Sequence, residues 1–112
     1  MSKIPVKRYQ LMKRRYPEFM AAVENLGTAA ASAGPLDERT KELIQLAAAA
    51  AAGLEGAVHS HARRALQAGA TPEAVCHTLL VLTSTIGFPT VVAALSWVDD
   101  VLEPKAAAKS SR

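Results

Sequence analysis

Glu42, His59 and His61 are the side chains in this sequence whose types and spacing could do chemistry. Both histidines belong to the stretch AAAAAAGLEGAVHSH, residues 47–61, in which six alanines precede a glycine-containing loop. An imidazole in contact with a carboxylate is the simplest general acid/base pair, because the carboxylate fixes the tautomer of the ring and increases its basicity. Which histidine can pair with Glu42 depends on the helices that carry these residues.

The two histidines cannot act together from one helix. Positions 59 and 61 of an α-helix point about 200° apart, so the HxH spacing is a poor chelate. His59 lies on the polar side of the expected helix, beside Glu55 and Arg63. The apolar side of the same helix holds His61 together with Ala57, Val58, Ala65 and Ala68. We therefore expect His61 to be the enclosed histidine.

Glu42 is placed to reach His61 across a helical hairpin. Glu42 lies 11 residues before Gly53 and His61 lies 8 residues after it, which is roughly 16 and 12 Å of helix. A glutamate side chain can bridge that difference. Two interpretations stay open: a general acid/base pair, or a solvated Glu42 near a helix N-terminus and a hydrogen-bonded core histidine. Spacing alone favours the second interpretation, since buried ion pairs are often structural.

The elements that must position these residues are all helical, because alternating strand patterns with hairpin turns are absent from the sequence. Proline, aspartate, threonine and glycine mark helix ends throughout. The expected helices are Pro5 to about Arg15, Pro17 to Gly34-Pro35, Asp37 as N-cap to Gly53, about Glu55 to Ala68 closed by Gly69, Thr71 as N-cap through Val81 and beyond, and a last helix with Val92 to Leu102 before Pro104. The third and fourth form an antiparallel hairpin.

Composition and charge divide the chain of 112 residues. Apolar residues make up 50% and aromatic residues 4%, so the core must be built from small and aliphatic side chains on packed helices. Residues 1–16 carry a net charge of +6, whereas residues 17–103 carry ten acidic against four basic residues. We expect a basic N-terminal segment (1–16), a helical domain (17–103) and a disordered tail (104–112). Few aromatic residues interleave the basic ones, so we expect no nucleic-acid partner.

A single cysteine, Cys76, cannot form an internal disulfide, and we expect it to be a buried apolar residue. No apolar run of signal-peptide type follows the N-terminal charges, and the alanine run is too short to cross a bilayer. The sequence thus predicts a soluble cytoplasmic protein without a membrane partner.

The order of these residues is similar to that of a known superfamily. The run KELIQLAAAAAAGLEGAVHSHARRALQAGAT, followed by LL and by GFP at Gly87 to Pro89, resembles the carboxymuconolactone decarboxylase and alkylhydroperoxidase D superfamily over about residues 17–103. The resemblance implies an alkylhydroperoxidase D-like all-α bundle that assembles into homotrimers or homohexamers. It also implies that Glu42 and His61 are the glutamate and histidine of a proton relay, and it places the two peroxidase cysteines on Leu54 and Ala57.

The departure at Leu54 and Ala57 changes the expected chemistry. A thiolate is the nucleophile toward peroxide, and neither residue can become one, so we expect no CxxC-type peroxidase activity. The decarboxylase branch of the superfamily needs neither a dithiol nor a cofactor. The resemblance then implies a lyase or isomerase acting on a small organic acid or carbonyl compound. His61 is the expected general acid/base, Glu42 orients it, and Leu54, Ala57 and Phe88 shape an apolar pocket without a metal.

Two other functions stay open. A non-catalytic oligomeric scaffold or ligand-binding module could keep the fold without the thiols, and a filled cavity at Glu42 and His61 would favour it. Alternatively, His59, His61 and a carboxylate could bind a metal across subunits, because such a site needs ligands from different helices.

Overall fold

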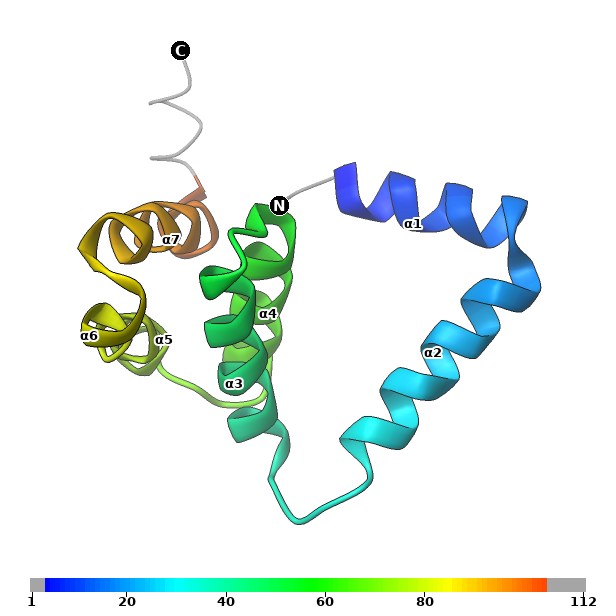
Figure 1. The fold of residues 1–112 in the computed structure, drawn as a ribbon, viewed down its shortest axis with the longest axis horizontal. Coiled ribbons are helices and arrows are strands. Elements are labelled where there is room, and N and C mark those ends of the chain that lie inside the picture. Colours follow the sequence, from blue (N-terminus) through cyan, green and yellow to red (C-terminus); the bar gives the residue numbers. More distant parts are fainter. Residues whose placement is uncertain (1–3, 105–112) are drawn as a thin grey trace. The chain divides into compact units, whose positions relative to one another are not determined.

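The computed structural model describes residues 4–104, and every regular element in that part of the chain is a helix. The tail predicted to be disordered lies outside the described residues, except for Pro104. In chain order the helices are α1 (Ile4–Arg15), α2 (Pro17–Ala31), α3 (Glu38–Ala51), α4 (Glu55–Gln67), α5 (Pro72–Leu80), α6 (Thr83–Ile86) and α7 (Phe88–Leu102) (Figure 1). The all-α prediction is confirmed. Within the described residues no helix is both long and apolar enough to cross a membrane.

The chain forms two compact units, one up to Leu36 and one from Asp37 onward. In the first unit α1 and α2 form a hairpin held by Glu24 of α2. The Tyr9 hydroxyl donates a hydrogen bond to the Glu24 carboxylate, and Lys13 Nζ lies 3.3 Å from the same carboxylate. The basic N-terminal segment is therefore largely a helix paired with α2. The boundary between these two compact units falls after Leu36, and the division of the chain after residue 16 stays a prediction.

The second unit is built on the hairpin of α3 and α4, which lie side by side in Figure 1. Gly53 forms the turn with φ +71°, a left-handed conformation that glycine adopts without steric cost. The alanine side chains on the inner face of α3 are small, so that α4 can approach closely. Leu46, Ala49 and Ala50 of α3 and Val58, Ala62 and Ala65 of α4 are buried in one core.

The remaining helices close this core from another side. α7 packs against α4 and α5 and buries Val91, Ala94 and Val98. The fifth helix is shorter than predicted, because it ends at Leu80 and α6 forms a separate turn before Gly87. The Thr83 hydroxyl donates to the Leu80 carbonyl at 2.8 Å, a local bond that competes with continuation of the helix. Likewise, α2 ends at Ala31, short of the predicted stop at Gly34-Pro35.

Both predicted side-chain caps are present. Asp37 Oδ1 accepts from the Thr40 amide at 2.8 Å, and Thr71 Oγ1 accepts from the Ala74 amide at 3.0 Å. Hydrogen bonding from Thr40 lowers the pKa of the Asp37 carboxyl. A depressed pKa in the folded state means that this cap adds stability above the unfolded-state pKa and loses it as the pH falls through the folded-state value.

Thr71→Ala should lower the free energy of unfolding by about 1 kcal/mol, because the Ala74 amide loses its acceptor. Thr71→Ser keeps an oxygen at the same position and should stay near the wild-type value. Urea denaturation followed by circular dichroism measures both. Equal stability of the alanine variant and the wild type would show that the cap contributes nothing.

Candidate active site

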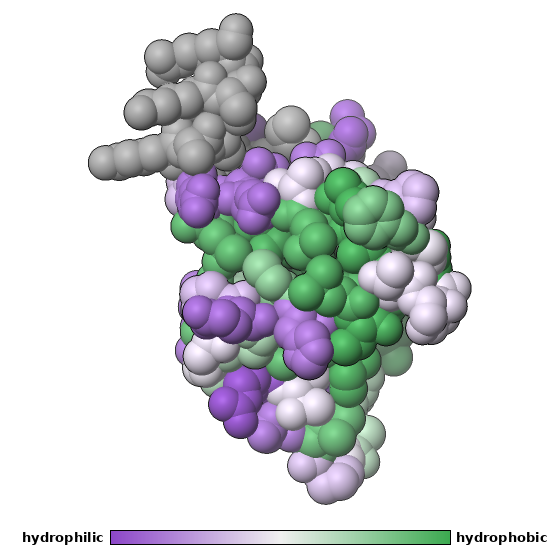
Figure 2. Space-filling model, turned by 90° about the vertical axis from the view of Figure 1, so that its left-hand side faces the viewer, coloured by the Kyte–Doolittle hydropathy of each residue, from purple (hydrophilic) through white to green (hydrophobic). Residues whose placement is uncertain are grey.

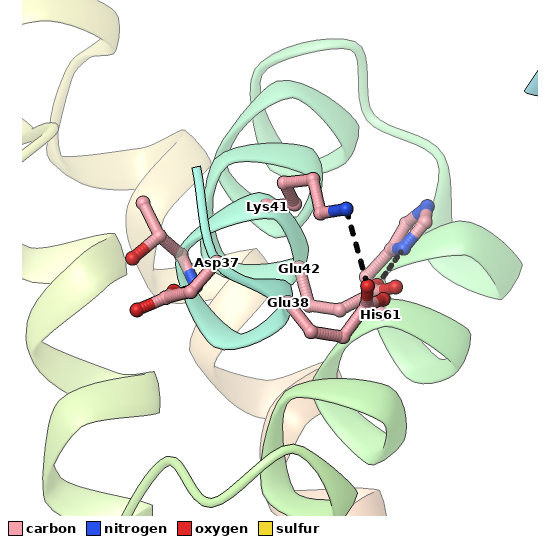
Figure 3. Close-up of polar contacts among 6 residues, drawn as sticks. Asp37, Glu38, Lys41, Glu42 and His61 are labelled. Atoms are coloured by element: carbon pink, nitrogen blue, oxygen red, sulfur yellow. Dashed lines mark hydrogen bonds and ion pairs between the residues drawn. The ribbon is translucent and has the colours of Figure 1, made fainter. Parts of the chain in front are cut away.

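Glu42 and His61 meet inside the α3–α4 hairpin. Glu42 Oε1 lies 2.8 Å from His61 Nδ1, and Figure 3 shows the two side chains pointing toward one another from the two helices. A carboxylate can only accept, so the Nδ1–H of His61 donates this hydrogen bond. The Nε2 atom of His61 therefore carries the ring lone pair and is the atom that can take or give a proton.

Both side chains of the pair are mostly buried. Glu42 is buried and the His61 side chain is 17% exposed. Directly beside the pair, Leu46 one turn along α3 and Ala62 and Ala65 on α4 are completely buried. The rigid core thus fixes both helices, and a hydrogen bond in a region of low dielectric is stronger than one in water. Packing therefore holds the two side chains in contact.

A cavity of about 420 Å³ opens beside Glu42. It is lined by Glu38, Glu42, Arg64, Gln67 and Ala68. Glu38 lies one turn before Glu42 on the same face of α3, and Lys41 Nζ is 3.3 Å from its carboxylate (Figure 3). The lining of the cavity is polar and includes the guanidinium group of Arg64. The i, i+4 spacing of Glu38 and Glu42, and of Arg64 and Ala68, could have indicated these residues from the sequence.

The apolar pocket expected from Leu54, Ala57 and Phe88 is a different set of residues from the lining of this cavity. Leu54 precedes α4 and Phe88 begins α7, and both are more than half exposed in the chain. Ala57 packs partly buried against the core. Their role in lining a pocket stays a prediction.

The prediction that His61 is the more enclosed of the two histidines is wrong. The His59 side chain is 11% exposed, against 17% for His61. His59 Nε2 lies 3.0 Å from Asp100 Oδ2 of α7 and 4.0 Å from Glu55 Oε2. The reason is the position of α7, which covers the side of α4 that the sequence pattern marks as polar. The two histidines do point to different partners, as the 200° argument requires.

Cys76 is half-buried on α5, packed against the core rather than inside it. Burial raises the pKa of the Cys76 thiol, which disfavours the thiolate that peroxide chemistry needs. The chain has no second cysteine, so a CxxC pair is absent.

Comparison with known proteins places the chain in a family. The model of the carboxymuconolactone decarboxylase family matches residues 17–100. An uncharacterized protein of Methanocaldococcus jannaschii is 31% identical over 98 residues, which are 88% of this chain and 92% of that protein. An uncharacterized protein of Haemophilus influenzae is 37% identical over 59 residues, which are 53% of this chain and 52% of that protein.

A solved structure has the same fold. The apo form of lpg0406, a carboxymuconolactone decarboxylase family protein from Legionella pneumophila, superposes with a TM-score of 0.81 at 29% identity, over 90% of each chain. Because the family match spans most of the helical chain and the solved structure shares its architecture, this protein belongs to the carboxymuconolactone decarboxylase family.

Proposed function

We propose that the protein is a cofactor-independent acid/base enzyme of lyase or isomerase type, acting on a small organic acid or carbonyl compound. The observation that carries this proposal is the 2.8 Å hydrogen bond from His61 Nδ1 to Glu42 Oε1 beside an open cavity. In the proposed reaction His61 is the general acid/base, and Glu42 is the residue that orients the imidazole ring of His61. Oriented imidazoles of this kind typically contribute about 10²–10⁴-fold to a rate.

The proposed chemistry is complete without a redox partner. In a decarboxylation the electrons of the breaking C–C bond pass into the adjacent carbonyl and form an enolate, and CO₂ leaves. The protonated His61 then gives its Nε2 proton to the enolate carbon and is reprotonated by water. In an isomerisation neutral Nε2 removes a proton next to the carbonyl and returns it to another carbon. Neither sequence of steps needs a thiol, in agreement with leucine and alanine at positions 54 and 57.

The cavity lining suggests how a substrate would be held. Arg64 and Gln67 offer N–H donors to a carboxylate or an enolate oxygen, and charge-assisted hydrogen bonds of this kind are the stronger ones. We place the acidic end of the substrate toward Arg64 and its reacting carbon toward His61. The predicted apolar pocket of Leu54, Ala57 and Phe88 lies outside this lining, and the proposed binding mode does not depend on it.

We also propose that the protein assembles with copies of itself into a homotrimer or homohexamer. The face formed by α5, α6 and α7 carries a broad hydrophobic area (Figure 2). Exposed apolar side chains on these helices or next to them are Leu80, Val81, Phe88 and Val92. Apolar surface of this extent is typical of an interaction site rather than of an isolated monomer.

The rival function is a non-catalytic scaffold or ligand-binding module. An accessible cavity next to the Glu42–His61 pair argues against a pure scaffold, which has no use for one, whereas a ligand-binding module would use it as an enzyme does. Catalytic turnover of a substrate distinguishes the enzyme from the non-catalytic module. A panel of small keto acids and lactones is the first set of compounds to screen for turnover.

His61→Gln should lower kcat for any substrate found in that screen by about 10²–10⁴-fold, because glutamine cannot exchange a proton near neutral pH. The oligomer should stay intact. His77→Gln, at an exposed histidine of α5, is the matched control and should keep wild-type activity. Wild-type turnover by His61→Gln would remove His61 from the mechanism.

Glu42→Ala should change the tautomer of His61. In the wild type, long-range ¹H–¹⁵N NMR should report the Nδ1–H form, because the carboxylate accepts from that atom. Without the acceptor the Nε2–H form should gain population. Glu38→Ala removes a carboxylate one turn away and should leave the tautomer unchanged. If the Nδ1–H form persists in Glu42→Ala, another group orients the ring.

Size-exclusion chromatography with light scattering should show a trimer or hexamer at micromolar concentration. Replacing Val81 and Phe88 together by serine should shift the mass toward the monomer, because apolar area is removed from the proposed interface. The paired substitution Arg39→Ser and Glu73→Ser, at two exposed charged positions, serves as control. A monomeric wild type would contradict the proposal.

A further inference from the structure

A second cluster of titratable side chains lies on the opposite side of α4 from His61. Glu55 and His59 are one helical turn apart on α4, and Asp100 reaches them from α7. One oxygen of each carboxylate and one ring nitrogen lie within 4.8 Å of one another. His59 Nε2 is 3.0 Å from Asp100 and 4.0 Å from Glu55. The three donor atoms therefore lie close to one another.

The charges of this cluster are not balanced by hydrogen bonding. A neutral imidazole donates one hydrogen from Nε2, which satisfies Asp100, while 4.0 Å is too long for a hydrogen bond to Glu55. Among the residues that the structure describes, no lysine or arginine forms an ion pair with either carboxylate. Two carboxylates thus face one imidazole, and like charges held close together destabilise each other. A cation between them would relieve this repulsion.

We propose that Glu55, His59 and Asp100 bind one divalent transition-metal ion of the zinc class. Imidazole nitrogen with carboxylate oxygen is a donor set that zinc accepts in proteins, and three protein ligands leave the fourth position to water. The imidazole favours zinc over magnesium and calcium, which prefer oxygen ligands. This site is separate from the Glu42–His61 pair, and the proposed acid/base reaction does not depend on it.

The geometry needs only small adjustments to hold such an ion. Two donor atoms bound to tetrahedral zinc lie about 3.3 Å apart. The observed separations of 3.0 and 4.0 Å fall on either side of that value. The Glu55 and Asp100 side chains are 55% and 42% exposed, so they can rotate, whereas His59 is held by the core. Val58 of α4 and Val98 of α7, both completely buried next to the ligands, fix the two helices.

The test is titration of the full chain, first freed of metal with a chelator, with zinc chloride in a calorimeter. We expect one zinc ion per chain, and we expect magnesium at the same concentration to give no comparable heat. His59→Gln, Asp100→Asn and Glu55→Gln should each weaken zinc binding by at least about tenfold. Asp100→Asn and Glu55→Gln replace partly exposed carboxylates by amides of the same shape. They therefore test the metal site even if His59→Gln folds poorly.

Two controls locate the site. The double variant Glu73→Gln, His77→Gln removes another glutamate–histidine pair at i, i+4, on α5, and should bind zinc like the wild type. His61→Gln should also keep the zinc site, which distinguishes it from binding at the Glu42–His61 pair. The proposal is overturned if the wild type binds no zinc, if the three ligand variants bind as the wild type does, or if His61→Gln or the α5 variant loses binding to the same extent.

Discussion

Close packing of α3 on α4 is the interaction on which the rest of the structure depends. Alanines on the inner faces of α3 and α4 let the two helices pack closely together. Because the two helices lie close together, Glu42 on α3 reaches His61 on α4. Gly53 makes the hairpin possible because its positive φ turns the chain directly after the alanine run. Site and core are thus consequences of the same contact.

Helix α4 has two chemically distinct sides because α3 and α7 flank it. The side facing α3 presents His61 to Glu42, and the side facing α7 presents His59 to Asp100. Each imidazole is held by one carboxylate from a neighbouring helix, so neither ring is free to rotate. The separation of about 200° on one helix prevents the histidines from sharing a ligand. One helix can therefore serve an acid/base pair and, as proposed, a cation site independently.

The chemistry open to this member of the family is narrowed by its residues. Leucine and alanine at positions 54 and 57 remove the thiols, and Cys76, with its raised pKa and lack of a partner, does not replace them. What remains at the hairpin is the His61 imidazole hydrogen-bonded to Glu42, and a cavity whose lining includes Glu42, the Arg64 guanidinium and the Gln67 amide. Proton transfer to and from a bound organic acid is the reaction class that such groups support.

The sequence by itself determined most of the helices and showed that Glu42 and His61 are placed to reach one another across the hairpin. Proline, Asp37, Thr71 and Gly53 act within one turn of their own position, and the distances of Glu42 and His61 from the turn follow from the rise of the helix. Only the tertiary structure decided the rest. His59 is buried because α7 covers it, and the cavity at Arg64 exists because α3 and α4 meet at a particular rotation. Such contacts join residues far apart in the chain, and their geometry depends on the packing of whole helices, which no local pattern encodes.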